Sequence, residues 1–185
     1  MSANSLDSHP IGLFYVVVSG PPGSGKTTVA RELARALGFP LLSKDTIKEA
    51  MMASLEVTDV ETSRRIGRAA IGAMLAVAAD SGFGVVESVW RRSISLPDLA
   101  ALPAPVVEVF CRCDAQLARS RYSERAGIRA PGHFDKDRLT DDELWQGEAA
   151  EPVRGDWPVL EVDTSRALDV GALVRPVREA IDGDR

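Results

Sequence analysis

Cysteine is scarce in this sequence of 185 residues, which limits what can hold the fold together. Only Cys111 and Cys113 are present, and they lie too close together in the chain to staple a domain of this size. We expect two free thiols in a reducing compartment, and therefore a cytoplasmic location. Half of a metal site is the alternative interpretation of the same pair.

Long apolar runs and an excess of basic charge are absent as well. The apolar run at 13–18 is far shorter than the ~20 residues of a membrane-spanning helix and lacks the flanks of a signal peptide. The 22 Lys and Arg are outnumbered by 27 Asp and Glu, which gives a net charge of −5. We therefore expect a soluble protein with no membrane partner, and a nucleic-acid partner is not favoured. The overall charge does not address a local basic patch.

Short apolar segments alternate with segments of helical periodicity. Strands are predicted at 13–18, 39–42, 85–87, 106–110 and 157–163, and helices at 29–37, at 45–52, from Thr58 to Gly82, from Asp114 onward and at 170–181. This alternation predicts an α/β, three-layer fold with an about five-stranded parallel sheet covered by helices on both faces. We expect a single domain over 1–185, with a frayed tail at 1–10 and a lid loop at about 125–137.

Three local patterns add detail to this fold. Thr58 and Glu61 have the spacing of a capping box, so the long helix is expected to open at Thr58. Thr140 and Glu143 repeat that spacing in front of a short helix. Pro176 falls inside the final predicted helix and is expected to kink it.

The segment Gly20-Pro21-Pro22-Gly23-Ser24-Gly25-Lys26-Thr27 follows the first predicted strand and opens the first predicted helix. Its glycines let the backbone curl until successive N–H groups point inward, and the helix adds its positive end. Lys26 brings a charge to the outer phosphates of a nucleotide, and the Thr27 hydroxyl can bind magnesium. The segment predicts a P-loop with ATP and Mg²⁺ as cofactors. A plain Gly/Pro-rich turn is the alternative.

Carboxylates at the carboxyl ends of neighbouring strands are the candidates for chemistry. Asp45 follows the second strand, where a general base for phosphoryl transfer is needed, although it can instead cap a helix beginning at Thr46. Glu87 ends the third strand and can hold magnesium-bound water or the acceptor, or be an ordinary strand-end carboxylate. Glu108 lies in mid-strand and is the weaker candidate.

Arginines gather between 119 and 129. Arg125 and Arg129 are predicted to close over the transferring phosphate, whereas a solvated helix face explains Arg119 and Arg121 equally well. His133 is interpreted as a surface loop residue rather than a catalytic base.

Residues after the third strand are candidates for an acceptor pocket. Trp90 and Arg91, together with Arg92, follow Glu87 closely and are predicted to line it. A partly buried ring and a solvated basic pair, Arg91 and Arg92, are the alternative.

With these motifs placed, the sequence resembles the small P-loop kinases of the nucleoside-monophosphate-kinase-like fold, a group with polynucleotide kinase, gluconate kinase and chloramphenicol phosphotransferase. The resemblance rests on Gly20 to Thr28, Leu42-Ser43-Lys44-Asp45, Val85-Val86-Glu87-Ser88, and a lid with Arg125, Arg129 and Pro131-Gly132-His133. It implies that Asp45 is the general base, that the lid arginines clamp the phosphates, and that 163–166 packs on adenine. The loop and the first helix are also similar to those of shikimate kinase, but Glu87-Ser88-Val89 replaces the Gly-Gly-Gly run that follows the third strand there, which argues against that substrate.

We therefore predict an ATP-dependent kinase that moves the γ-phosphate to a hydroxyl of a small molecule of antibiotic, sugar or nucleoside type. The alternatives are an ATP-binding regulatory module and a polynucleotide 5′-hydroxyl kinase, whose basic track would be Arg64, Arg65, Arg68, Arg91 and Arg92. A GTPase is excluded, because its Asn-Lys-x-Asp motif needs an asparagine and Asn4 is the only one.

The predicted site residues fall into overlapping groups by role. The catalytic group is Lys26, Asp45, Arg125 and Arg129. The nucleotide-binding group is Gly20, Pro22, Gly23, Ser24, Gly25, Lys26, Thr27, Thr28, Thr164 and Arg166. The substrate-binding group is Lys44, Asp45, Glu87, Trp90 and Arg91, and the metal ligands are Thr27 and Glu87.

Overall fold

The structure, a computed structural model, describes residues 13–126, 133–134 and 144–183. Several predictions fall outside this range: the tail at 1–10, Arg129, the Thr140 and Glu143 cap, and most of the segment interpreted as a lid.

The core of the fold is a five-stranded, all-parallel sheet in the order β2-β3-β1-β4-β5. Its central strand β1 (Tyr15–Ser19) is buried at every position, as a continuous apolar run in a parallel sheet predicts. The other strands are β2 (Leu41–Ser43), β3 (Gly84–Glu87), β4 (Val106–Arg112) and β5 (Val159–Asp163). The predicted sheet is confirmed, with strand ends shifted by a few residues.

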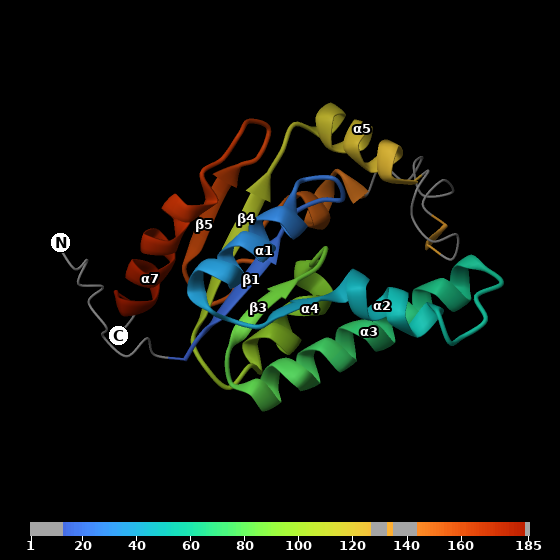
Figure 1. The fold of residues 1–185 in the computed structure, drawn as a ribbon, viewed down its shortest axis with the longest axis horizontal. Coiled ribbons are helices and arrows are strands. Elements are labelled where there is room, and N and C mark those ends of the chain that lie inside the picture. Colours follow the sequence, from blue (N-terminus) through green and yellow to red (C-terminus); the bar gives the residue numbers. More distant parts are fainter. Residues whose placement is uncertain (1–12, 127–132, 135–143, 184–185) are drawn as a thin grey trace, which may run out of the picture.

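Helices cover both faces of the sheet (Figure 1). Val16 and Val18 point to the face covered by α1 (Lys26–Leu37) and α7 (Val174–Asp182), and Tyr15 and Val17 to the face covered by α3 (Val60–Ser81) and α4 (Arg92–Ala100). The remaining helices are α2 (Lys44–Met52), α5 (Ala115–Ala126), and the short 3-10 turns η3 (Gly147–Ala150) and η4 (Val170–Leu173). Among the described residues, no helix combines the length and the apolar character of a membrane span.

The start of α3 differs from the prediction. The helix begins at Val60, and Asp59 is its N-cap, with Oδ1 accepting a hydrogen bond of 2.7 Å from the Thr62 amide. Thr58 donates its hydroxyl proton to Asp59 instead of capping the helix itself. The predicted opening at Thr58 was wrong by two residues because the neighbouring carboxylate is the stronger cap.

The end of the chain also differs. In place of one kinked helix over 170–181, the structure has the turn η4 followed by α7, whose third residue is Pro176. A helix leaves its first amides without intrahelical partners, so a proline in this turn costs little. The predicted kink was therefore wrong.

The helix α4 was missed from the sequence. Its short apolar pattern is interrupted by Pro97, yet Ser95 and Leu99 are buried. Arg91 is the N-cap of this helix and Arg92 is its first residue.

Candidate active site

The phosphate loop between β1 and α1 has, at its turning points, a backbone conformation that strongly favours glycine. Gly20, Gly23 and Gly25 have φ values of 134°, 79° and 81°. A Cβ at Gly20 would lie 2.7 Å from the Cys111 carbonyl oxygen, and one at Gly23 only 2.0 Å from that of Ala118. The glycines are therefore required both by conformation and by the close approach of β4 and α5.

The loop offers unsatisfied hydrogen-bonding groups to a ligand. Ser24 is buried, and its Oγ has no hydrogen-bond partner within the described residues. The loop leads directly into the N-terminus of α1, whose amides and dipole favour an anion. An orphaned hydroxyl beside a helix N-terminus fits the phosphates of a nucleotide.

Lys26 is 7% exposed, and its Nζ donates a hydrogen bond of 2.9 Å to the Pro21 carbonyl oxygen. Burial lowers the pKa of this ammonium, and the charges of Glu87 and Asp45 counteract that effect, whereas Arg125 adds to it. Three charged side chains from separate parts of the chain therefore act on the same ammonium. Burial also raises the pKa of the Cys111 thiol, whose charge is coupled to that of Lys26, to about 12.

Glu87 is held in place at the end of β3. It pairs in register with Val18, so its side chain points to the α1 face of the sheet. The carboxylate is 5% exposed and accepts a hydrogen bond of 2.8 Å from Ser43 Oγ at the end of β2. Glu87 is thus a buried carboxylate of the site rather than an ordinary exposed strand end.

Asp45 lies at the same edge of the sheet but is open to solvent. It is the second residue of α2, whose N-cap is Ser43, so the alternative of a cap for a helix starting at Thr46 was wrong. Its side chain is 45% exposed, and Oδ1 forms an ion pair of 2.9 Å with Lys44 Nζ. An accessible carboxylate beside Lys26 is what an acceptor hydroxyl requires.

The other side of the loop is supported by α5 and the segment after it. Trp145 donates its indole N–H to the Pro22 carbonyl oxygen at 3.0 Å, and Arg119 stacks 4.6 Å from the centre of the Trp145 ring. Tyr122 packs edge-on against the same ring. The solvated helix face that was the alternative explanation for Arg119 is therefore not what the structure shows. Trp145 was missed because no motif near it signals a contact with the loop.

Thr164 and Arg166, predicted to bind the nucleotide, lie just after β5. The Thr164 hydroxyl is buried, 2.7 Å from the Ser24 carbonyl oxygen and 2.8 Å from that of Arg112, so it braces the loop from outside. Arg121 donates to the Thr164 carbonyl oxygen at 3.1 Å. Arg166 is exposed, and its charge is a minor contribution, after hydrogen bonds from Ser165, to the lowered pKa of Asp163.

The residues after β3 that were predicted to line the acceptor pocket differ in how deeply they are buried. Trp90 is 1% exposed and packs in the core with Tyr15, Met74 and Leu99, so its assignment to a pocket wall was wrong. Arg91 is half-buried at the start of α4.

Two further expectations are corrected by the structure. Arg92 is not simply solvated, because it donates to the carbonyl oxygens of Val153 and Arg154. His133 is 4% exposed rather than a surface residue, and its Nε2 lies 2.9 Å from Glu49 Oε1 on α2. Arg125 is exposed in the last turn of α5, and its contact with a transferring phosphate stays a prediction.

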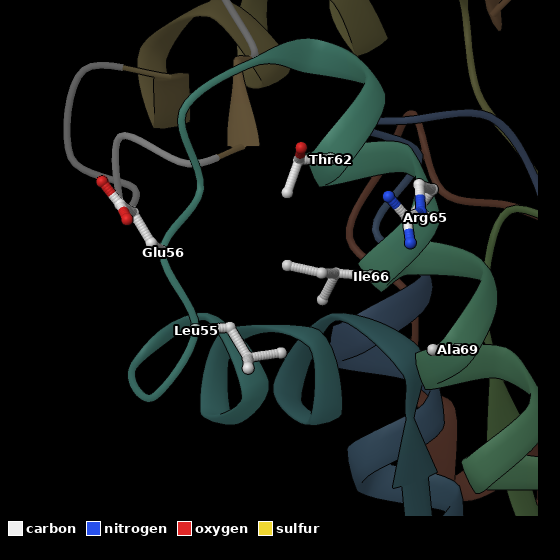
Figure 2. A pocket seen from close by; sticks show the side chains of 6 residues that line it. All are labelled: Leu55, Glu56, Thr62, Arg65, Ile66 and Ala69. Atoms are coloured by element: carbon white, nitrogen blue, oxygen red, sulfur yellow. The ribbon is translucent and has the colours of Figure 1, made fainter.

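A cavity of about 360 Å³ opens between α3 and the loop after α2 (Figure 2). Its described lining mixes apolar and polar side chains: Leu55, Glu56, Thr62, Arg65, Ile66 and Ala69. Lys48 Nζ donates to Ser63 Oγ at 2.7 Å and links α2 to α3 beside this cavity.

Within the described part of the chain, no group of three or more His, Cys, Asp or Glu side chains is placed to hold a metal ion.

Comparison with known proteins shows which family the chain belongs to. The model of the AAA domain family matches residues 16–143. A cytidylate kinase from Pyrobaculum neutrophilum is 36% identical over 119 residues, which cover 61% of this chain and 61% of that protein. The chain thus spans about three fifths of the length of this curated relative.

Solved structures extend the likeness to almost the whole chain. A protein designated a kinase, from Chloroflexus aurantiacus j-10-fl, is 30% identical with a TM-score of 0.77, covering 91% of this chain and 98% of that one. A sugar kinase from Janibacter sp. HTCC2649 is 20% identical with a TM-score of 0.57, covering 92% of this chain and 95% of that one, and it shows the fold alone. The predicted resemblance to small P-loop kinases is confirmed, and the chain belongs to the AAA domain family.

Proposed function

We propose that this chain is an ATP-dependent kinase that transfers the γ-phosphate to a hydroxyl group of a small molecule. The observation that carries the proposal is that Lys26, Glu87 and Asp45 lie at or just after the carboxyl ends of β1, β3 and β2, beside a glycine loop with an unsatisfied buried hydroxyl. The kinases among its relatives support the same reaction type. The two free cysteines support a cytoplasmic location.

The loop and its helix hold the nucleotide in this proposal. The amides around Gly23 and Gly25, the Ser24 hydroxyl and the Lys26 ammonium bind the phosphate oxygens. Thr27 and Glu87 offer two oxygens to Mg²⁺, which when bound neutralises phosphate charge. Arg125, in the last turn of α5, contributes a further positive charge near Lys26.

Asp45 is the general base. It takes the proton of the acceptor hydroxyl as that oxygen forms a bond to the γ-phosphorus, while the bond to the departing ADP oxygen breaks. The ion pair with Lys44 orients the carboxylate, and its 45% exposure leaves room for the acceptor. Sugars, nucleosides and hydroxylated antibiotics carry the hydroxyl that this chemistry needs.

A second candidate acceptor is a nucleoside monophosphate, as the name of the cytidylate kinase relative suggests. A phosphate oxygen already carries negative charge and needs no base, so the accessible Asp45 favours the hydroxyl acceptor. The basic track of a polynucleotide kinase has little support, because Arg92 contacts backbone carbonyl oxygens and Arg68 pairs with Glu61 at 3.1 Å.

The replacement Asp45→Asn tests the proposal. We expect it to keep ATP affinity within about twofold and to lower turnover with a hydroxyl acceptor by 10²-fold or more, because general-base catalysis contributes on that order. Transfer from radiolabelled ATP across a panel of hydroxylated compounds and cytidine monophosphate measures it.

Asp80→Asn is the matched control, because Asp80 is exposed near the end of α3, at the amino edge of the sheet. Unchanged turnover in Asp45→Asn would remove the base assignment. Turnover that is unchanged only with cytidine monophosphate would favour the second acceptor.

A further inference from the structure

A carboxylate lies fully buried in the middle of the sheet, away from the site described above. Glu108 on β4 is 0% exposed and pairs in register with Val17, so it points to the face opposite to Lys26. An apolar side chain would fill this position without the cost of desolvating a carboxylate. The charge therefore needs an explanation beyond packing.

Both carboxylate oxygens of Glu108 are occupied by donors. Oε1 accepts from Ser19 Oγ at 2.6 Å and from the Val153 amide at 2.8 Å. Oε2 accepts from the Arg154 amide at 3.0 Å and, at 3.4 Å, from the indole N–H of Trp157. Bonds to an ionised acceptor are among the stronger ones in proteins, so this carboxylate fixes the position of each donor.

One donor comes from the residue before the phosphate loop, and the other three come from the segment that precedes β5. Ser19 is the last residue of β1 and directly precedes Gly20. Arg154 has a left-handed backbone, with φ of 51°, which a non-glycine residue keeps only when its surroundings impose it. Its segment leads into β5 and on to Thr164, whose hydroxyl contacts the loop carbonyl of Ser24.

We propose that Glu108 is a positioning residue for the phosphate loop, which it directs through the hydroxyl of Ser19. The inference rests on the proposed function, since it assumes that the loop binds a triphosphate. Glu108 does not touch the nucleotide in this account. It sets the angle at which β1 enters the loop, so its loss weakens nucleotide binding rather than the chemical step.

Replacing one donor to each carboxylate oxygen of Glu108 gives a matched pair of variants. Ser19→Ala removes the donor at the loop stem, whereas Trp157→Phe removes a donor from the other oxygen and leaves the stem intact. We expect Ser19→Ala to raise the Kd and KM for ATP about tenfold with kcat at saturation within about twofold, because one charge-assisted hydrogen bond is lost. Trp157→Phe is expected to lower the Tm and to leave the Kd for ATP unchanged.

Glu108→Gln and the double variant Ser19→Ala/Glu108→Gln complete the test, with each fold checked by circular dichroism and ATP binding by calorimetry. Because Ser19 acts through Glu108, the double variant should bind ATP no more weakly than Glu108→Gln alone. Equal effects of Ser19→Ala and Trp157→Phe on affinity would overturn the inference, as would a folded Glu108→Gln protein with normal affinity. A wild-type protein that binds no ATP would instead refute the proposed function.

Discussion

Lys26 supplies a positive charge to the site, and its amine must stay protonated although it is buried. Burial lowers its pKa, and the Glu87 carboxylate is the largest of the opposing influences. The ammonium that meets the phosphates therefore depends on a carboxylate from a different strand. By keeping Lys26 protonated, Glu87 favours nucleotide binding independently of any contact with magnesium.

Replacing Glu87 by Gln should shift the pH dependence of nucleotide binding. Without the carboxylate the pKa of Lys26 falls further, so the protonated lysine, and with it ATP affinity, is lost at a lower pH as the pH rises. ATP titrations from pH 6.5 to 10 in the absence of magnesium measure this effect separately from metal binding. Glu179→Gln, on the exposed side of α7, is the control. Coincident pH profiles for wild type and Glu87→Gln would contradict the coupling.

Single residues differed in how far the sequence could predict them. The positions of Asp45 and Glu87 in the fold were predictable because each lies at or just after the end of a short apolar strand. The carboxyl ends of parallel strands meet at one edge of a sheet. Trp90 and His133 were misassigned because their burial depends on helices distant in sequence. Trp145 reaches the loop only through the packing of α5, which leaves no local signal.

At the scale of elements, the phosphate loop and α5 are packed backbone to backbone. The carbonyl oxygen of Ala118 occupies the space that a Cβ at Gly23 would need, at 2.0 Å. Gly38, at the end of α1, has a similar φ of 70° but no neighbour within 4 Å of a Cβ. The two glycines therefore separate the effect of conformation from that of contact.

Gly23→Ala and Gly38→Ala are expected to behave differently. Gly38→Ala should cost only the strain of a left-handed residue, about 1 kcal/mol, and leave ATP binding unchanged. Gly23→Ala should lower the Tm further and weaken ATP binding at least about tenfold, because α5 or the loop must move. Thermal unfolding and ATP titration of both variants provide the comparison. Similar losses in the two proteins would show that the α5 contact is unimportant.

Elements with strong periodicity were predictable and those defined by tertiary contacts were not. The five strands and the long helix α3 follow from apolar runs and repeats that are visible in the chain. The helix α4 escaped because Pro97 interrupts its short pattern. The last helix was predicted as one piece because periodicity alone does not distinguish η4 from α7.

At the scale of the whole molecule, the strand order places the phosphate loop at the centre of the sheet. The strand β1 lies between β3 and β4, so its loop receives Glu87 from one side and α5 from the other. Ser43 at the end of β2 pairs in register with Glu87, so Asp45, two residues later, lies at the same edge of the sheet. The single domain over 1–185 stays a prediction. The identity of the acceptor depends on the shape of its pocket, which no local sequence pattern encodes.

Calorimetric titration of the full chain with ATP and magnesium, alongside its Lys26→Ala variant, tests the central claim most directly. The account predicts binding to wild type with a Kd below about 1 mM, the upper range of enzyme substrates, and at least tenfold weaker binding to the variant. Equal heats for the two proteins, or none for wild type, would contradict the assignment of the glycine loop as a triphosphate site.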